Sequence, residues 1–232
     1  MRSLAFALFF LVSSACDDSY PRDPEQTSER VARSGVLRVG ITEHPPWTVR
    51  SERGDARGPE AEVVRRFAQA IGATAHFRWG QQEALLEALE HFELDLVVGG
   101  LREDTLFADK VGLSDPWYVE RWGVGLPAQA EPVSDLDGLE VLVAPESLLA
   151  SKLRKAGARP QETPAWRTVT GALAAPLPVL RARGATLVDD ELAVHEHVIA
   201  APPGENRWLG QLARFLARDA VTLAALGASA WQ

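Results

Sequence analysis

One stretch, residues 94–118 (LDLVVGGLREDTLFADKVGLSDPWY), constrains the fold of this chain more than any other. It opens with a short apolar run at 94–98 that Gly99 and Gly100 end. This length and these flanks are typical of a buried strand in a parallel sheet rather than of a helix. Two glycines at the carboxyl end of a strand allow a ligand to approach the backbone closely. Because open α/β sheets bind small molecules at that edge, the stretch predicts an α/β fold with a ligand site beside Gly100.

Hydrophobic patterning before this stretch predicts alternating strands and helices. We expect strands at 36–41 and 75–79, and helices at 60–71 and 82–91, ahead of the buried strand at 94–98. Strands and helices in this order predict a parallel sheet with right-handed connections. The rest of the chain adds strands expected at 121–126, 141–144 and 194–200, one irregular strand within 159–167, and helices expected at 147–155, 170–183, 202–218 and 221–231.

Several short blocks recur in the order that one known family has them. Asp95 to Leu101 and Val111 to Tyr118 resemble the central block of bacterial extracellular solute-binding protein family 3, the amino-acid-binding class of periplasmic receptors. The opening strand, the segment 134–138 and the segment 184–190 are similar to further blocks of that family. The resemblance implies a two-lobed, periplasmic-binding-protein-like (type II) α/β fold with a cleft between the lobes.

The resemblance also implies how the chain is divided. Lobe 1 would comprise residues 35–126, with 199–232 returning to it, and lobe 2 would comprise 127–198. A hinge-like crossing is expected at 127–132. Two lobes joined in this way close over a ligand in the cleft.

Candidate ligand contacts follow from the same blocks. An aromatic ring after the first strand can stack on a flat or cationic ligand, although Trp47 can equally pack under its loop and His44 can face solvent. A helix beginning at Ser147 offers free N–H groups to an anion, or Ser147 serves only as a helix cap. In family members a final acid holds the ammonium group of the ligand, and it falls here on Asp190. The predicted contacts are His44, Trp47, Gly100, Arg102, Trp117, Ser147 and Asp190.

One departure from the family concerns the carboxylate clamp. Family members use an arginine in a Thr-Pro-Glu-Arg turn, and alignment without gaps places Phe107 there. A bidentate guanidinium is the natural partner of a carboxylate, so Arg102 is the candidate replacement. The alternative is that Arg102 pairs on the surface with a nearby acid, which would be Glu103, Asp104 or Asp109. Two further matched acids, Glu60 and Glu62, are expected to favour the start of their helix rather than to touch ligand.

The N-terminus predicts export and a lipid anchor. Arg2, the apolar run at 3–12 and the small residues at 13–15 are typical of a signal peptide, which we place at residues 1–15. Cys16 follows at the position where bacterial lipoproteins carry their lipid, although Ser13 stands where an aliphatic residue is usual. The alternative is ordinary cleavage that leaves a free thiol. Residues 16–34 are polar and charged and predict a flexible tether.

Composition excludes several functions. A formal charge of −8 without a basic patch argues against nucleic acid as a partner, and a single cysteine excludes an internal disulfide. His195 and His197 would share one face of a strand, but two ligands are too few for a metal site. The sequence contains no phosphate-binding loop and no serine-hydrolase or zinc-protease motif. We therefore predict no cofactor, no metal and no catalytic residue.

Together these features predict an extracytoplasmic solute-binding lipoprotein. It would be monomeric, lie in the periplasm or at the cell surface, and capture a small anionic or zwitterionic, amino-acid-like solute for an ABC transporter. One alternative is a sensor or accessory subunit of another membrane system. A second is a dehydratase-like enzyme on the same scaffold.

Overall fold

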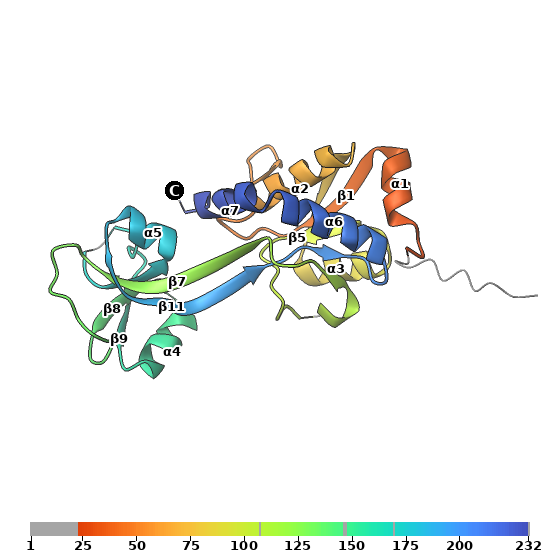
Figure 1. Ribbon diagram of the computed structural model, residues 1–232. Helices are drawn as coiled ribbons and strands as arrows, with labels where there is room; N and C mark the ends of the chain where they lie inside the picture. The colour runs from red at the N-terminus through yellow and green to blue at the C-terminus, as the bar shows by residue number, and fades with distance from the viewer. Residues whose placement is uncertain (1–22, 107, 146–147, 169, 232) are drawn as a thin grey trace, which may run out of the picture.

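Two separate β-sheets organise the chain, one in each of two lobes (Figure 1). The computed structural model describes residues 23–106, 108–145, 148–168 and 170–231. The predicted signal peptide, Cys16, Phe107 and Ser147 lie outside these residues. Within the described part of the chain, no helix is long and apolar enough to cross a membrane.

The first lobe contains the predicted parallel sheet. Strand β1 pairs in parallel with β4 on one side and β5 on the other, while β12 runs antiparallel to β5 and β6. The strands, in the order β4-β1-β5-β12-β6, are Thr74–Trp79, Val36–Ile41, Leu96–Val98, Ala200–Ala201 and Gly112–Leu113. Helices α2 (Pro59–Ala70) and α3 (Gln82–Glu90) connect the parallel strands, and the short strands β2 (Val49–Arg50) and β3 (Ala56–Arg57) form a hairpin. A single 3-10 turn, η1, covers Ala108–Lys110.

The C-terminal helices pack on the first lobe. Helix α6 (Asn206–Arg218) is strongly amphipathic, and α7 (Ala220–Ser229) follows it. Phe67 of α2 lies between two rings of α6, at 5.3 Å from Trp208 and 5.4 Å from Phe215 between ring centroids. These buried aromatic contacts join the last part of the chain to the sheet formed by the first part.

The second lobe contains a mixed sheet crossed by two long strands. Its strand order is β11-β7-β10-β8-β9, and the strands are Thr186–His197, Tyr118–Leu126, Leu173–Pro176, Glu140–Val143 and Arg159–Glu162. Helices α4 (Leu148–Lys155) and α5 (Leu177–Ala182) belong to this lobe. Figure 1 shows β7 and β11 leaving the first lobe together and extending to the far end of the second.

This arrangement corrects the predicted lobe boundary. Strand β7 is hydrogen-bonded to β11 along its length, from Tyr118 opposite His197 to Leu126 opposite Thr186, so residues 118–126 form part of the second sheet. The predicted hinge at 127–132 follows the far end of β7. The two crossings are instead the ends of β7 and β11 nearest the first lobe.

The predicted flexible tether is wrong over its last part. Residues Thr27–Ser34 form helix α1, whose Val31 is buried in the core of the first lobe. The buried carboxylate of Glu205 accepts hydrogen bonds from the backbone N–H groups of Glu25 and Thr27 at 2.8 and 2.9 Å. These N–H groups have no partner within the helix, so an acid far along the sequence caps the start of α1, while the nearby Asp23 accepts the N–H of Ser28 at 3.3 Å.

The predicted helix at 170–183 is also only partly correct. Leu173–Pro176 forms the buried strand β10, and the helix begins at Leu177. A residue that precedes proline is disfavoured in the helical conformation, and Pro176 and Pro178 lie within this segment. The leucines are spaced as in a helix, and this spacing led to the prediction of a helix over residues that form β10.

Candidate functional site

Two adjoining cavities lie between the lobes, beside the crossing strands. One has a volume of about 550 Å³ and the other about 590 Å³, and both are lined by Arg102, Asp104, Trp122 and His195. The first is lined from the first lobe by His44, Trp47 and Gly100, from the crossing strands by Glu120 and His197, and from the C-terminus by Trp231. The second extends toward α4, where Leu148, Leu149 and Lys152 line it. We name these two cavities together the cleft.

A buried acid lies behind the sheet edge that the sequence singles out. Glu60, in the first turn of α2, is 1% exposed and accepts hydrogen bonds from the N–H groups of Gly99 at 2.7 Å and Gly100 at 3.0 Å. The Nδ1 atom of His197 lies 3.1 Å from the other carboxylate oxygen of Glu60. Glu60 therefore joins helix α2, the end of β5 and the crossing strand β11. The expectation that it only favours the start of its helix is incomplete.

A second buried acid, Glu120, continues this network. One of its oxygens lies 3.3 Å from Nδ1 of His195 and 3.7 Å from Nε2 of His197, and the other accepts a hydrogen bond at 2.9 Å from the indole of Trp231. His195 and His197 alternate along β11 and so share one face of the strand. The two histidines, which were considered and rejected as a metal site, instead contact the carboxylates of Glu120 and Glu60.

Two groups of this network, Glu120 and His197, have shifted pKa values. Burial alone would raise the pKa of the Glu120 carboxyl, but His195 and His197 lower it to about 2. Burial alone would lower the pKa of His197, yet the carboxylates of Glu120 and Glu60 raise it above its ordinary value. The raised pKa of His197 favours the protonated imidazole, which lies between the two carboxylates and links both crossing strands to the first lobe.

This arrangement predicts a pH dependence of stability. Because the pKa of His197 is raised in the folded protein, its contribution is complete below the ordinary value of 6.5 and is lost as the pH rises through the raised pKa. The difference in unfolding free energy between wild type and His197→Gln, measured with urea, should therefore be larger at about pH 6 than at about pH 9. The same substitution at the exposed His91 should change the unfolding free energy by less than about 0.5 kcal/mol, as is usual for surface positions. A His197 difference that stays constant would contradict the assigned protonation.

His44 and Gly100 lie against each other at the cavity wall. Gly100 has a φ of +74°, and a side chain there would meet the His44 ring at 2.4 Å from Cδ2. Burial lowers the pKa of His44 below its ordinary value, so the ring is neutral at neutral pH. The predicted role of Gly100 changes as a result: its N–H binds Glu60, and its missing side chain makes room for His44.

Both predicted tryptophan contacts are largely packing residues. Trp47 is 2% exposed, and its ring lies 3.9 Å from His197 and 6.1 Å from Trp117 between centroids. Trp47 lines one cavity of the cleft and also packs against His197 and Trp117. Trp117 is buried in the first-lobe core and is not among the residues that line the two cavities of the cleft. Trp47 is therefore packed in the first-lobe core, as one alternative predicts, and it also lines the cleft, so its contact with a ligand stays a prediction.

Arg102 lines both cavities of the cleft and also pairs with an acid. Its Nε atom donates to Asp104 at 2.9 Å and one terminal nitrogen donates at 3.3 Å, and the side chain is partly exposed. The backbone N–H of Arg102 donates to Thr105, which orders the turn. Arg102 therefore pairs with Asp104, as the surface alternative predicts, and also lines the cleft, while its contact with a ligand stays a prediction.

The structure does not bring Asp190 to the cleft. Asp190 is exposed and lies in a bulge of β11, where the register with β7 shifts between Asp189 and Ala193. The backbone at Asp190 packs beside Gly123 in the second sheet. The residues of β11 that line the cleft begin at Val194, beyond this bulge. The acid expected to hold an ammonium group therefore lies outside the lining of both cavities.

Sequence reasoning missed most of the buried network. It did not single out Glu120, Trp122 and Trp231, and it assigned Glu60 to a helix end and the two histidines to a rejected metal site. The alternation His195-Glu196-His197 was the available signal, because it places two imidazoles on one side of a crossing strand. Within the described residues, no group of three histidine, cysteine or acidic side chains is arranged to hold a metal ion.

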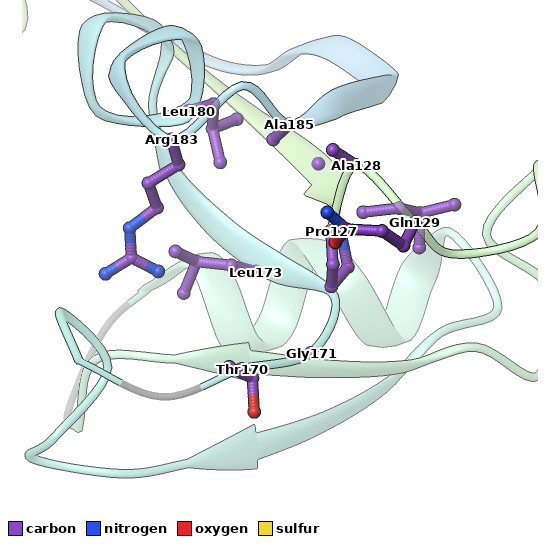
Figure 2. A pocket seen from close by; sticks show the side chains of 11 residues that line it. Pro127, Ala128, Gln129, Thr170, Gly171, Leu173, Leu180, Arg183 and Ala185 are labelled. Carbon is purple, nitrogen blue, oxygen red and sulfur yellow. The ribbon is translucent and has the colours of Figure 1, made fainter.

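Another cavity lies at the far end of the second lobe (Figure 2). It has a volume of about 320 Å³ and lies between the end of β7, the start of β10 and α5. Figure 2 shows Leu173, Leu180 and Arg183 on one side of it and Pro127 and Gln129 on the other. None of the predicted contact residues lines this cavity, so the cleft remains the candidate site.

Comparison with solved structures supports the fold. An ancestral cationic amino acid solute-binding protein superposes with a TM-score of 0.66 at 20% identity, covering 89% of this chain and all (100%) of the other. The L-cystine solute receptor of Neisseria gonorrhoeae, in its unliganded open conformation, gives 0.65 at 17% identity over 84% of this chain and 90% of the receptor. An ancestral amino-acid-binding protein described as a precursor of cyclohexadienyl dehydratase gives 0.54 at 18% identity over 85% and 97%.

These similarities confirm the predicted fold class, a two-lobed periplasmic-binding-protein fold of mixed α/β type. No protein-family model and no curated protein matches the sequence.

Proposed function

We propose that this chain is an extracytoplasmic solute-binding protein that captures a small, zwitterionic or anionic, amino-acid-like solute in the cleft. The observation that carries the proposal is the position of the cleft, which lies beside both crossing strands and is lined from both lobes. A site at this position is covered when two lobes rotate about their crossings. The solved structures with this fold include amino-acid receptors, and this agrees with the proposal.

The proposal includes a role for Arg102. Its guanidinium lies at the wall shared by the two cavities, where the carboxylate of a solute could replace Asp104 as its partner. The exposed pair with Asp104 contributes little stability, so exchange of partners costs little. We further propose that the solute is delivered to an ABC transporter and that Cys16 anchors the monomeric protein at the outer face of the membrane after removal of residues 1–15.

A thermal-shift screen of amino acids, betaines and small carboxylates tests the proposal. At least one solute should raise the melting temperature, since a ligand that binds only the folded state stabilises it. Arg102→Ala should weaken binding of that solute by about ten-fold or more, the loss expected for a charged hydrogen bond. Arg57→Ala, an exposed arginine in the same lobe, should bind as wild type does. A panel without any stabilising solute would contradict the receptor function, whereas unchanged binding by Arg102→Ala would remove only the clamp.

A specific observation supports a second candidate, an enzyme on this scaffold. Buried acids and histidines with shifted pKa values border the cleft, and such groups are used in acid–base catalysis. The partly exposed His195 also lines the cleft, and Glu120 orients its ring through Nδ1. Turnover of a cleft-bound solute, lost in His195→Gln while binding remains, would favour this candidate over the receptor.

A further inference from the structure

Three tryptophans from separate parts of the chain meet at the edge of the cleft. Trp122 lies on the crossing strand β7, Trp166 lies between β9 and β10, and Trp231 follows α7. The ring centroid of Trp122 lies 6.5 Å from that of Trp166 and 5.7 Å from that of Trp231. All three rings are half-buried, and both Trp122 and Trp231 line the cleft. We call these three residues the tryptophan group.

The tryptophan group already holds a cation that belongs to the chain itself. The Cζ atom of Arg167 lies 4.9 Å from the centroid of the Trp166 ring and 5.3 Å from that of Trp231. Both distances fall within the range in which a cation is attracted to the negative face of an indole. Arg167 is exposed, and no acid among the described residues forms an ion pair with it. The ring faces are therefore its principal charge-attracting contacts.

An anionic side chain lies beside this aromatic group. The indole N–H of Trp231 donates to Glu120 at 2.9 Å, so the carboxylate fixes the ring that contacts Arg167. Indoles that meet at an angle, as Trp122 and Trp231 do at 81°, can surround a quaternary ammonium or guanidinium group with their ring faces, and a carboxylate nearby adds to the attraction. The contact also links the lobes, because Arg167 belongs to the second lobe and Trp231 follows a helix of the first.

We propose that Trp122, Trp166 and Trp231 form a cation cage, that Arg167 is its internal occupant, and that the onium head of a bound solute displaces Arg167. The inference rests on the proposed solute-binding function and names the charged group that the solute carries. A zwitterion then spans the cleft, with its cation in the tryptophan group and its carboxylate toward Arg102. Displacement of Arg167 also releases a contact between the lobes, so occupation of the cage and movement of the lobes are coupled.

Isothermal titration calorimetry with choline tests the cage. The matched ligand is the neutral tert-butyl analogue of choline, in which carbon replaces the charged nitrogen. Wild type should bind choline at least about ten-fold more tightly than this analogue, because only the cation is attracted to the ring faces. Arg167→Gln should tighten choline binding by about two- to five-fold, since the internal competitor is gone. Trp166→Ala should weaken it by about ten-fold, and the exposed Arg159→Gln of β9 should leave it unchanged.

The outcomes separate this inference from the proposed function. Equal affinity for choline and its neutral analogue, or no gain in Arg167→Gln, would overturn the cage. If another solute stabilises the protein while no onium compound binds wild type or Arg167→Gln, the cage is wrong and the receptor function stands. If no solute of any class binds either protein, both are wrong.

Discussion

Glu60→Ala should lower the free energy of unfolding by about 3–5 kcal/mol, the cost typical of removing one partner from a buried charged network. Glu60 accepts hydrogen bonds from the N–H groups of Gly99 and Gly100 and pairs with His197; the contacts with Gly99 and His197 are buried and the contact with Gly100 is partly buried. Removal leaves two N–H groups without an acceptor and an imidazole with one carboxylate instead of two. Urea denaturation at neutral pH, followed by circular dichroism, measures the change.

Glu62 provides a matched control on the same helix. It is partly exposed and pairs with Arg66 one turn away, so Glu62→Ala should cost less than about 1 kcal/mol. Glu60→Gln should fall between the two, because an amide oxygen still accepts one N–H. A Glu60→Ala protein as stable as Glu62→Ala would show that Glu60 does not join the lobe to the crossing strand.

Asp95→Ala should lower the free energy of unfolding by about 3 kcal/mol or more. Asp95 is 0% exposed, forms ion pairs with Arg30 of α1 and Arg38 of β1, and accepts the backbone N–H of Arg38 at 2.8 Å. Its loss leaves that N–H and two guanidinium groups without their shared partner. Both arginines are partly exposed and regain some water, so the cost is expected at the lower end of the range for buried pairs.

Two comparisons check the role of Asp95. Glu93→Ala removes an exposed acid two residues away that pairs with Arg78, and should change stability by less than about 1 kcal/mol. Amide hydrogen exchange should also accelerate in Thr27–Ser34 of Asp95→Ala, because Arg30 then no longer holds α1 to the lobe. Unchanged exchange in α1 would contradict the account of how this helix is docked.

The fold was predictable where local pattern and burial agree. Val36–Ile41 alternates as a strand and is one, and α2 begins at Pro59 and ends before Gly72, as its stripe and its flanking residues predict. Helix α1 was not predictable in this way, because two acids from other parts of the chain hold it. Glu205 accepts backbone N–H groups at its start, and Asp95 pairs with its Arg30. Both partners lie far along the sequence, so composition alone suggested a tether.

The candidate site was predictable only in its local parts. His44, Gly100 and Arg102 reach the cleft because they follow β1 and β5 directly, and the ends of neighbouring parallel strands meet at one edge. Asp190 does not reach it, because the second lobe has a bulge where the matched motif would end. Trp231 and Glu120 meet through contacts between the C-terminus and a crossing strand, and no spacing in the sequence indicates such a contact.

The proposed receptor function requires the two lobes to close over a solute in the cleft. Leu106 and Leu148 lie on opposite lobes, line its two cavities and are each 78% exposed, which makes them suitable for spin labels. The labels require Leu106→Cys and Leu148→Cys in a Cys16→Ser chain, and double electron–electron resonance then reports the distance between them. If the lobes close, a solute identified by thermal shift moves the distribution of distances between the two labels to shorter values. An identical distribution with and without saturating solute would contradict it.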